Sequence, residues 1–364
     1  MKRFISSVLV LGVCLTPLTM PVMVQPIWAQ SQNSQVEELQ RLIQQARQQE
    51  RQGQARQAIE IWQQVLAIGR QFKIKRFEAL ALTRIGFNYL RISQPQEALK
   101  YLNQALPIWR EVDDRAEKAN TLIYIGRVYD IISQPQEALK YYNQALPILR
   151  AVGDRDREAA TLNNISLVYS NISEPQEALK YLNQALIINQ KVGNRAGEAT
   201  ILSNIGLVYN SISQQQEALK YYNQALPIIR QVGDRALEAA TLTGIGAVYN
   251  SIFQPQEALK YYNQALPIRR EVGDRRGEAT ILNNIGIVYN SISQQQEALK
   301  YFNQALPISQ EVGDRAGEAK TLNNIGAVYI SISQPQEALK YFNLALPIIR
   351  AVGDRRMEAK LSSI

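Results

Sequence analysis

The chain repeats itself every forty residues, and this period constrains its fold more than any other feature. A small residue recurs at one place in each of eight units, and an alanine follows it twelve residues later. The small residues are Ala46, Gly86, Gly126, Ser166, Gly206, Gly246, Gly286 and Gly326; the alanines are Ala58, Ala98, Ala138, Ala178, Ala218, Ala258, Ala298 and Ala338. Units that repeat in phase predict a solenoid, in which each unit packs only on its neighbours.

Each unit carries two apolar stripes of helical period. Around Gly206, apolar residues recur at steps of three and four residues, the spacing of one buried helix face. The first stripe is Leu202, Ile205, Val208, Tyr209 and Ile212, and the second is Ala218, Leu219, Tyr222, Ala225, Leu226 and Ile229. We therefore predict an all-α chain of eight helix-turn-helix units, with short turns that make neighbouring helices antiparallel.

The turns contain residues that start and end helices. Ser93 precedes Pro95, which predicts a serine N-cap with proline in the first turn of each second helix. At the other turn, Gly233 is suited to a left-handed C-cap and Asp234 to the N-cap of the next first helix.

The N-terminus does not belong to the repeats. Lys2 and Arg3 precede an apolar run at residues 4–18, and Ala29 follows, which is the layout of a secretory signal peptide. We predict cleavage after Ala29, which N-terminal sequencing of the mature protein would test. Because no later stretch is apolar enough to span a membrane, the mature chain is expected in the periplasm or outside the cell, without a transmembrane segment.

The predicted organisation has four parts. The signal peptide covers residues 1–29 and a polar linker rich in Gln, Ser and Asn covers residues 30–35. The repeat array covers residues 36–357, and residues 358–364 begin a ninth first helix that has no partner helix.

Composition argues against catalysis. The chain contains no histidine, and its only cysteine is Cys14, inside the predicted signal peptide. The commonest general base and the usual Cys/His metal ligands are therefore missing. Recurring serines and aspartates at the turns are explained by helix capping, and paired tyrosines such as Tyr141 and Tyr142 by packing. We expect a protein that is not an enzyme, needs no cofactor or metal and binds no nucleic acid.

The repeat pattern resembles a known family. The sequence L-x2-I-G-x2-Y followed by A-x3-[YF]-x2-A is similar to the tetratricopeptide repeat in a forty-residue form, like that of kinesin light chains, LGN/Pins adaptors and exported bacterial repeat proteins. One copy consists of Leu202, Ile205, Gly206, Tyr209, Ala218, Tyr222 and Ala225. The resemblance implies a right-handed superhelix, an α-solenoid whose first helices line a concave groove that holds peptide segments.

The same resemblance selects candidate groove residues. They are Asn163, Asn164, Asn204, Asn210, Asn250, Asn283, Asn284, Asn290, Asn323 and Asn324. An asparagine amide both donates and accepts hydrogen bonds, so a row of them suits the backbone of an extended peptide. Each could instead cap a helix, bond a neighbouring helix or face water.

The front of the array is basic. Residues 30–95 hold ten Lys and Arg against five Glu, within a net charge of +8 for the whole chain. Arg84, Arg91 and Arg127 fall at groove positions and would suit an acidic peptide or an anionic surface. They could equally be solvated arginines on an exposed helix.

These observations favour a non-enzymatic scaffold that binds a peptide or helical segment of a protein partner. One alternative is a homo-oligomer that stacks through an open C-terminal end, which light scattering would test. Another is that the array is the repeat region of a longer protein with a separate effector domain.

Overall fold

The structure is a computed structural model that describes residues 27–361, and this part of the chain contains helices and no strands. The first helices of the units are α1 (Ile27–Arg51), α3 (Lys75–Arg91), α5 (Arg115–Ile131), α7 (Arg155–Asn171), α9 (Arg195–Ser211), α11 (Arg235–Ser251), α13 (Arg275–Ser291), α15 (Arg315–Ser331) and the short α17 (Arg355–Leu361). The second helices are α2 (Ala55–Gln71), α4 (Pro95–Glu111), α6 (Pro135–Val152), α8 (Pro175–Val192), α10 (Gln215–Val232), α12 (Pro255–Glu271), α14 (Gln295–Glu311) and α16 (Pro335–Val352). The predicted all-α solenoid of helix pairs is confirmed.

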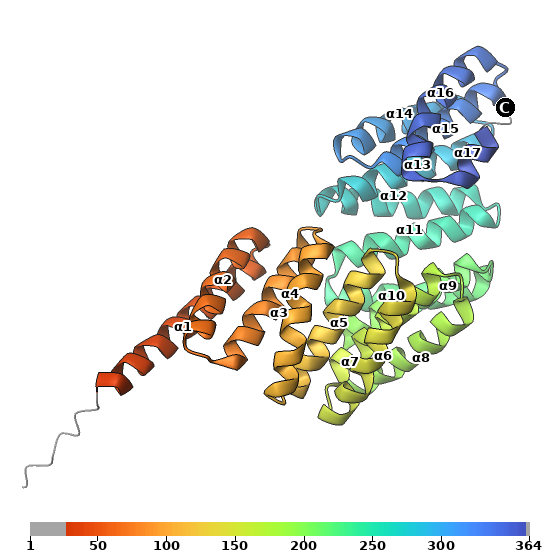
Figure 1. Ribbon diagram of the computed structural model, residues 1–364. Helices are drawn as coiled ribbons and strands as arrows, with labels where there is room; N and C mark the ends of the chain where they lie inside the picture. Colours follow the sequence, from red (N-terminus) through yellow and green to blue (C-terminus); the bar gives the residue numbers. More distant parts are fainter. Residues whose placement is uncertain (1–26, 362–364) are drawn as a thin grey trace, which may run out of the picture.

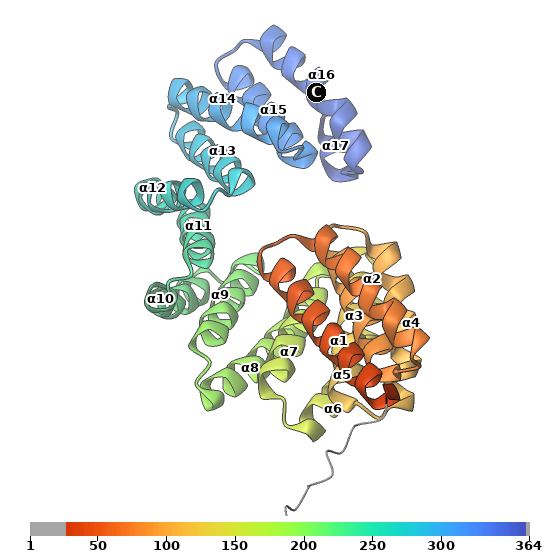
Figure 2. The ribbon, with the colours of Figure 1, turned by 90° about the vertical axis from the view of Figure 1, so that its left-hand side faces the viewer.

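The solenoid is curved, with the first helices on its inner side. Each helix packs on the next one in the chain, as Figure 1 shows from α1 at one end to α17 at the other. First helices also contact each other across neighbouring units, for example α3 with α5 and α13 with α15. Second helices have no comparable contacts with each other among the described residues. The first helices therefore line the concave face, and Figure 2 shows the resulting curved row of helix pairs.

The small residue of each unit lies against a core side chain. A Cβ atom added to Gly286 would lie 2.6 Å from Cε1 of Phe302, and one added to Gly126 would lie 2.6 Å from Cε1 of Tyr142. Phe302 and Tyr142 are almost completely buried. The glycines therefore recur because the two helices of a unit approach closely there, which offsets the roughly 0.5–1 kcal/mol that glycine loses to alanine within a helix.

One of the two predicted turn types is confirmed. Gly233 ends α10 in the left-handed conformation, with φ 80°. Asp234 then caps α11, because its carboxylate accepts a hydrogen bond from the backbone N–H of Leu237 at 2.9 Å.

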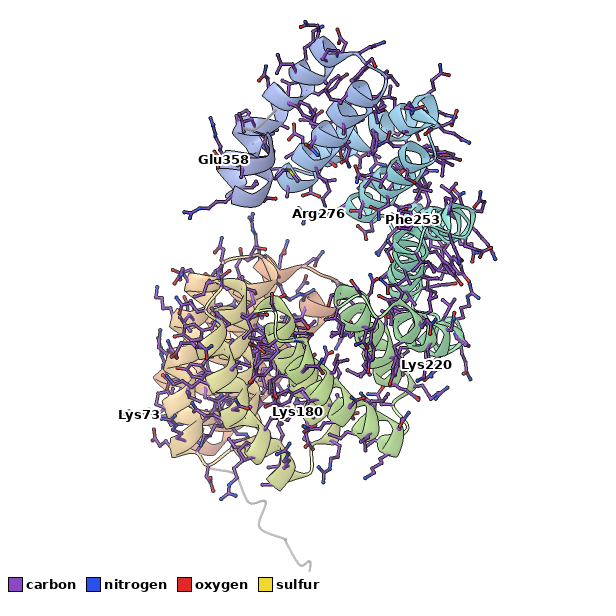
Figure 3. The ribbon with its side chains drawn as sticks, turned by 90° about the vertical axis from the view of Figure 1, so that its right-hand side faces the viewer. Lys73, Lys180, Lys220, Phe253, Arg276 and Glu358 are labelled. Carbon is purple, nitrogen blue, oxygen red and sulfur yellow. The ribbon has the colours of Figure 1, made fainter. Side chains whose placement is uncertain are left out.

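The prediction that serine is the N-cap of the second helices is wrong. Ser213 has φ 58°, and its N–H donates to the backbone oxygen of Asn210, so it ends the first helix. The N-cap of α10 is Gln214, which makes no side-chain capping bond. A turn this short needs one left-handed residue between the helices, and serine occupies that place. In unit 6 the place holds Phe253, which is 89% exposed and labelled in Figure 3.

Helix α1 differs from the expected N-terminal layout. It begins at Ile27 and includes residues 30–35, for which the sequence predicts a linker. The segment is helical because glutamine is a good helix former and no glycine or proline separates it from the first repeat. Most of the predicted signal peptide lies outside the described residues, and its cleavage remains a prediction. At the other end, α17 begins at Arg355, and residues 362–364 also lie outside.

No helix in the described part of the chain is long and apolar enough to cross a membrane.

Candidate functional site

The candidate site is the concave face formed by the first helices. Half-buried asparagines alternate there with exposed apolar side chains, including Leu207, which is 54% exposed, and Leu167. The helical period brings both kinds of residue to the same face in unit after unit. A surface of amides and isolated apolar side chains can bond a peptide backbone and pack against its side chains.

Four of the predicted asparagines connect neighbouring units. Asn204 donates to the side-chain oxygen of Asn163 at 2.8 Å, and Asn324 donates to that of Asn283 at 3.0 Å. Thr321 also donates to the Asn283 oxygen, at 3.3 Å. For these four asparagines, the alternative of a bond to a neighbouring helix is correct, so they stabilise the solenoid.

Five other asparagines have no side-chain hydrogen bond to any described residue. All five are half-buried on the first helices, and they are Asn164, Asn210, Asn250, Asn284 and Asn290. The side-chain oxygen of Asn290 is buried without a partner. Because a buried polar atom without a partner destabilises a protein, the Asn290 oxygen is suited to accepting a hydrogen bond from a ligand. Asn323, at the place that Asn163 and Asn283 occupy in their units, is half-buried and is a sixth asparagine without a side-chain hydrogen bond to any described residue.

The concave face contains a hollow of about 480 Å³ between α5 and α7. It brings together two predicted site residues, Arg127 and Asn164, with Asp130 and the apolar side chains of Ile131 and Leu167. The exposed Arg127 has no ion pair within 4 Å among the described residues. Cationic, anionic, amide and apolar groups therefore surround one space.

Two titratable side chains of this hollow, the half-buried Asp130 and the buried Tyr142, have raised pKa values. Burial raises the pKa of Asp130, opposed by a hydrogen bond from Asn171 and by the charge of Arg127. Burial also raises the pKa of the Tyr142 phenol, with a smaller contribution from the charge of Asp130. The Tyr142 phenol, which lines the hollow, therefore stays protonated at neutral pH. From the sequence, Tyr142 is assigned to packing and Asp130 is not singled out.

A second hollow, of about 320 Å³, lies near the C-terminal end. Asn283 and Asn284 line it together with Asp314 and Lys320. The structure thus places Arg127 and Asn164 at one hollow and Asn283 and Asn284 at another, and the other predicted site residues line neither of these two hollows.

The predicted positive charge at the front of the array is reduced by Glu50, an acidic residue that the sequence analysis missed. Glu50 is buried, and its carboxylate forms an ion pair with Arg84. It also accepts from the indole N–H of Trp62 at 3.0 Å, and its backbone oxygen accepts from Arg91 at 2.7 Å. Because Glu50 offsets the charge of Arg84, we correct the view of Arg84 as a free groove cation. Glu50 occupies a groove position of unit 1, and this position could have identified it from the sequence.

No group of three or more His, Cys, Asp or Glu side chains in residues 27–361 is arranged to hold a metal ion.

Comparisons with known proteins agree with this architecture. A tetratricopeptide repeat model matches residues 77–151, 157–231, 214–271, 237–311 and 277–351. No curated protein sequence matches the chain.

Several solved structures share the fold at low sequence identity. The apo form of the quorum sensor NprR from B. thuringiensis is 17% identical, with a TM-score of 0.67 over 89% of this chain and 100% of that chain. A STAND protein with a tetratricopeptide repeat sensor, PH0952 from Pyrococcus horikoshii, is 16% identical, with a TM-score of 0.66 over 83% of this chain and 46% of that chain. The present chain thus spans about half the length of PH0952.

A Rap protein solved in complex with competence and sporulation factor is 15% identical, with a TM-score of 0.59 over 90% of this chain and 96% of that chain. These identities establish the fold alone. Since the repeat model matches more than half of its residues, the chain belongs to the tetratricopeptide repeat family.

Proposed function

We propose that the protein is a non-enzymatic scaffold that binds an extended peptide segment of a partner protein along its concave face. One observation carries this proposal: five half-buried asparagines on successive first helices lack side-chain partners, beside exposed apolar side chains. An extended peptide supplies a backbone N–H and C=O at every residue, which matches a row of amides.

The hollow around Arg127 supports a preference for acidic residues at one point of the peptide. Arg127 has no ion pair there, while Ile131 and Leu167 offer an apolar wall. An acidic residue beside an apolar one in the ligand would fit both groups. The Rap protein of similar fold, solved in complex with competence and sporulation factor, is compatible with ligand binding by such an array.

A selected peptide would test the proposal. Peptides that bind the protein would be isolated from a random library displayed on phage, and their affinity measured by fluorescence polarisation. The groove variant would combine Asn164→Ala, Asn210→Ala, Asn250→Ala and Asn284→Ala. We expect its affinity to fall at least ten-fold, because each lost hydrogen bond contributes about 0.5–1.5 kcal/mol.

The matched control uses four exposed asparagines of the second helices. They are Asn183, Asn223, Asn263 and Asn303. Their replacement by alanine should leave binding unchanged. Equal affinity of the groove variant and the wild-type protein for every selected peptide would rule out the proposal.

A further inference from the structure

A buried glutamate closes most of the boundaries between units. Glu158 at the start of α7 accepts from Arg150 at 2.7 Å and from Arg155 at 2.6 Å, and its side chain is only 4% exposed. The same place holds Glu78, Glu198, Glu238, Glu278, Glu318 and Glu358 in other units. The carboxylate in each case accepts from the end of the preceding second helix, so it joins two units and offsets nearby positive charge.

The boundary between α4 and α5 lacks this glutamate. Lys118 occupies its place, while Arg110 and Arg115 remain at the places of Arg150 and Arg155. The nearest acid in sequence, Glu117, accepts a hydrogen bond from Asn120 at 3.3 Å. Three cations therefore meet where other boundaries have two polar or cationic donors and a carboxylate.

These cations line a hollow of about 390 Å³. Its wall consists of Trp109, Arg110, Asp113, Arg115, Lys118, Pro147, Ile148 and Ala151. Asp113 lies 3.7 Å from the Arg115 guanidinium, and both side chains are well exposed. The charged side chains sum to +2, since three are cationic and one is anionic.

Two of the three cations are unpaired. The side chains of Arg110 and Lys118 have no hydrogen bond or ion pair with any residue between 27 and 361. The hollow shares no residue with the two hollows of the concave face. It is therefore a separate site, and it combines a cationic rim with an apolar wall from α6.

We propose that this boundary binds an oxyanion, a carboxylate or phosphate group carried by an organic ligand. The group would take the place of the missing glutamate between Arg110, Arg115 and Lys118. Guanidinium groups bind carboxylate and phosphate through paired N–H donors, and lysine adds a compact positive charge. The apolar remainder of the ligand would pack on Pro147, Ile148 and Ala151.

Calorimetric titration of the whole protein with inorganic phosphate and, separately, with succinate tests this site. We expect saturable binding of at least one probe at millimolar concentration, weakening as salt is added. Lys118→Glu restores the residue found at the other boundaries, so it should fold normally and weaken binding at least ten-fold. Phosphate binding alone would assign a phosphate ligand, and succinate binding alone a carboxylate.

The control is Lys220→Glu, which makes the same change of charge at an exposed lysine of α10 labelled in Figure 3. It should bind each probe as the wild-type protein does. The proposal is overturned if neither probe binds saturably, or if Lys118→Glu and Lys220→Glu reduce binding equally.

Discussion

The spacing between helices is set by single small residues. Six of the eight units have glycine where the second helix presses a core side chain against the first. In unit 4 this place holds Ser166, and Leu182 takes the place of the aromatic ring. Ser166 is buried and donates to the backbone oxygen of Asn163 at 2.6 Å. In that unit, a serine in place of glycine therefore faces a leucine in place of an aromatic ring.

We predict that Gly286→Ala destabilises the protein by about 1–3 kcal/mol, the usual effect of overpacking a core. The added methyl group would lie 2.6 Å from the Phe302 ring, which is only 1% exposed. Urea unfolding followed by circular dichroism measures the change.

A second substitution, combined with Gly286→Ala, tests whether contact with the Phe302 ring causes this loss of stability. Phe302→Ala removes the ring, so the same glycine substitution should cost less in that background. An equal loss of stability in both backgrounds would show that contact with the ring is not responsible.

At the scale of the helix, the two turns of a unit connect one helix to the next in different ways. Asp234 supplies a side-chain oxygen to the first free N–H groups of α11, whereas Ser213 supplies only a left-handed backbone. A serine before a proline or glutamine is a familiar N-cap pattern, but a left-handed residue must come first in this turn. The local sequence therefore pointed to the wrong residue.

Asp234→Ala should destabilise the protein by about 1 kcal/mol, because the N–H of Leu237 loses its acceptor. Ser213→Ala should change stability by less than about 0.5 kcal/mol, as for a surface substitution that removes no bond. Thermal unfolding of both variants measures the two effects. If Ser213→Ala reduced stability as much as Asp234→Ala does, Ser213 would be a helix cap after all.

At the scale of the whole molecule, the main contacts between helices in residues 27–361 lie within one unit or between adjacent units, and the sequence period equals the structural period. Removal of one complete period should therefore leave every remaining interface intact. Stability should fall, because one unit and one interface are lost.

Deletion of residues 246–285 removes forty residues and joins Ile245 to Gly286 within one first helix. We expect a folded protein with an unchanged fraction of helix by circular dichroism and a lower Tm. Deletion of residues 246–283 leaves two extra residues at the junction, which turn the following apolar stripe by about 200°. That variant should lose cooperative unfolding, and equally stable deletions would contradict the dependence on register.

The sequence by itself determined the helix pairs, the forty-residue unit, the glycine and aspartate turns and the family, because periodicity and helix capping are local properties. It also indicated the concave face, although not the partners of its residues. Tertiary structure decided that Asn163 and Asn283 bond the next unit while Asn164 and Asn284 do not, and that Glu50 pairs with Arg84. It also placed Lys118 beside two arginines in a hollow. These outcomes depend on contacts between side chains of neighbouring units, which lie about forty residues apart in the sequence. The sequence pattern within a single helix does not show which of these side chains touch each other.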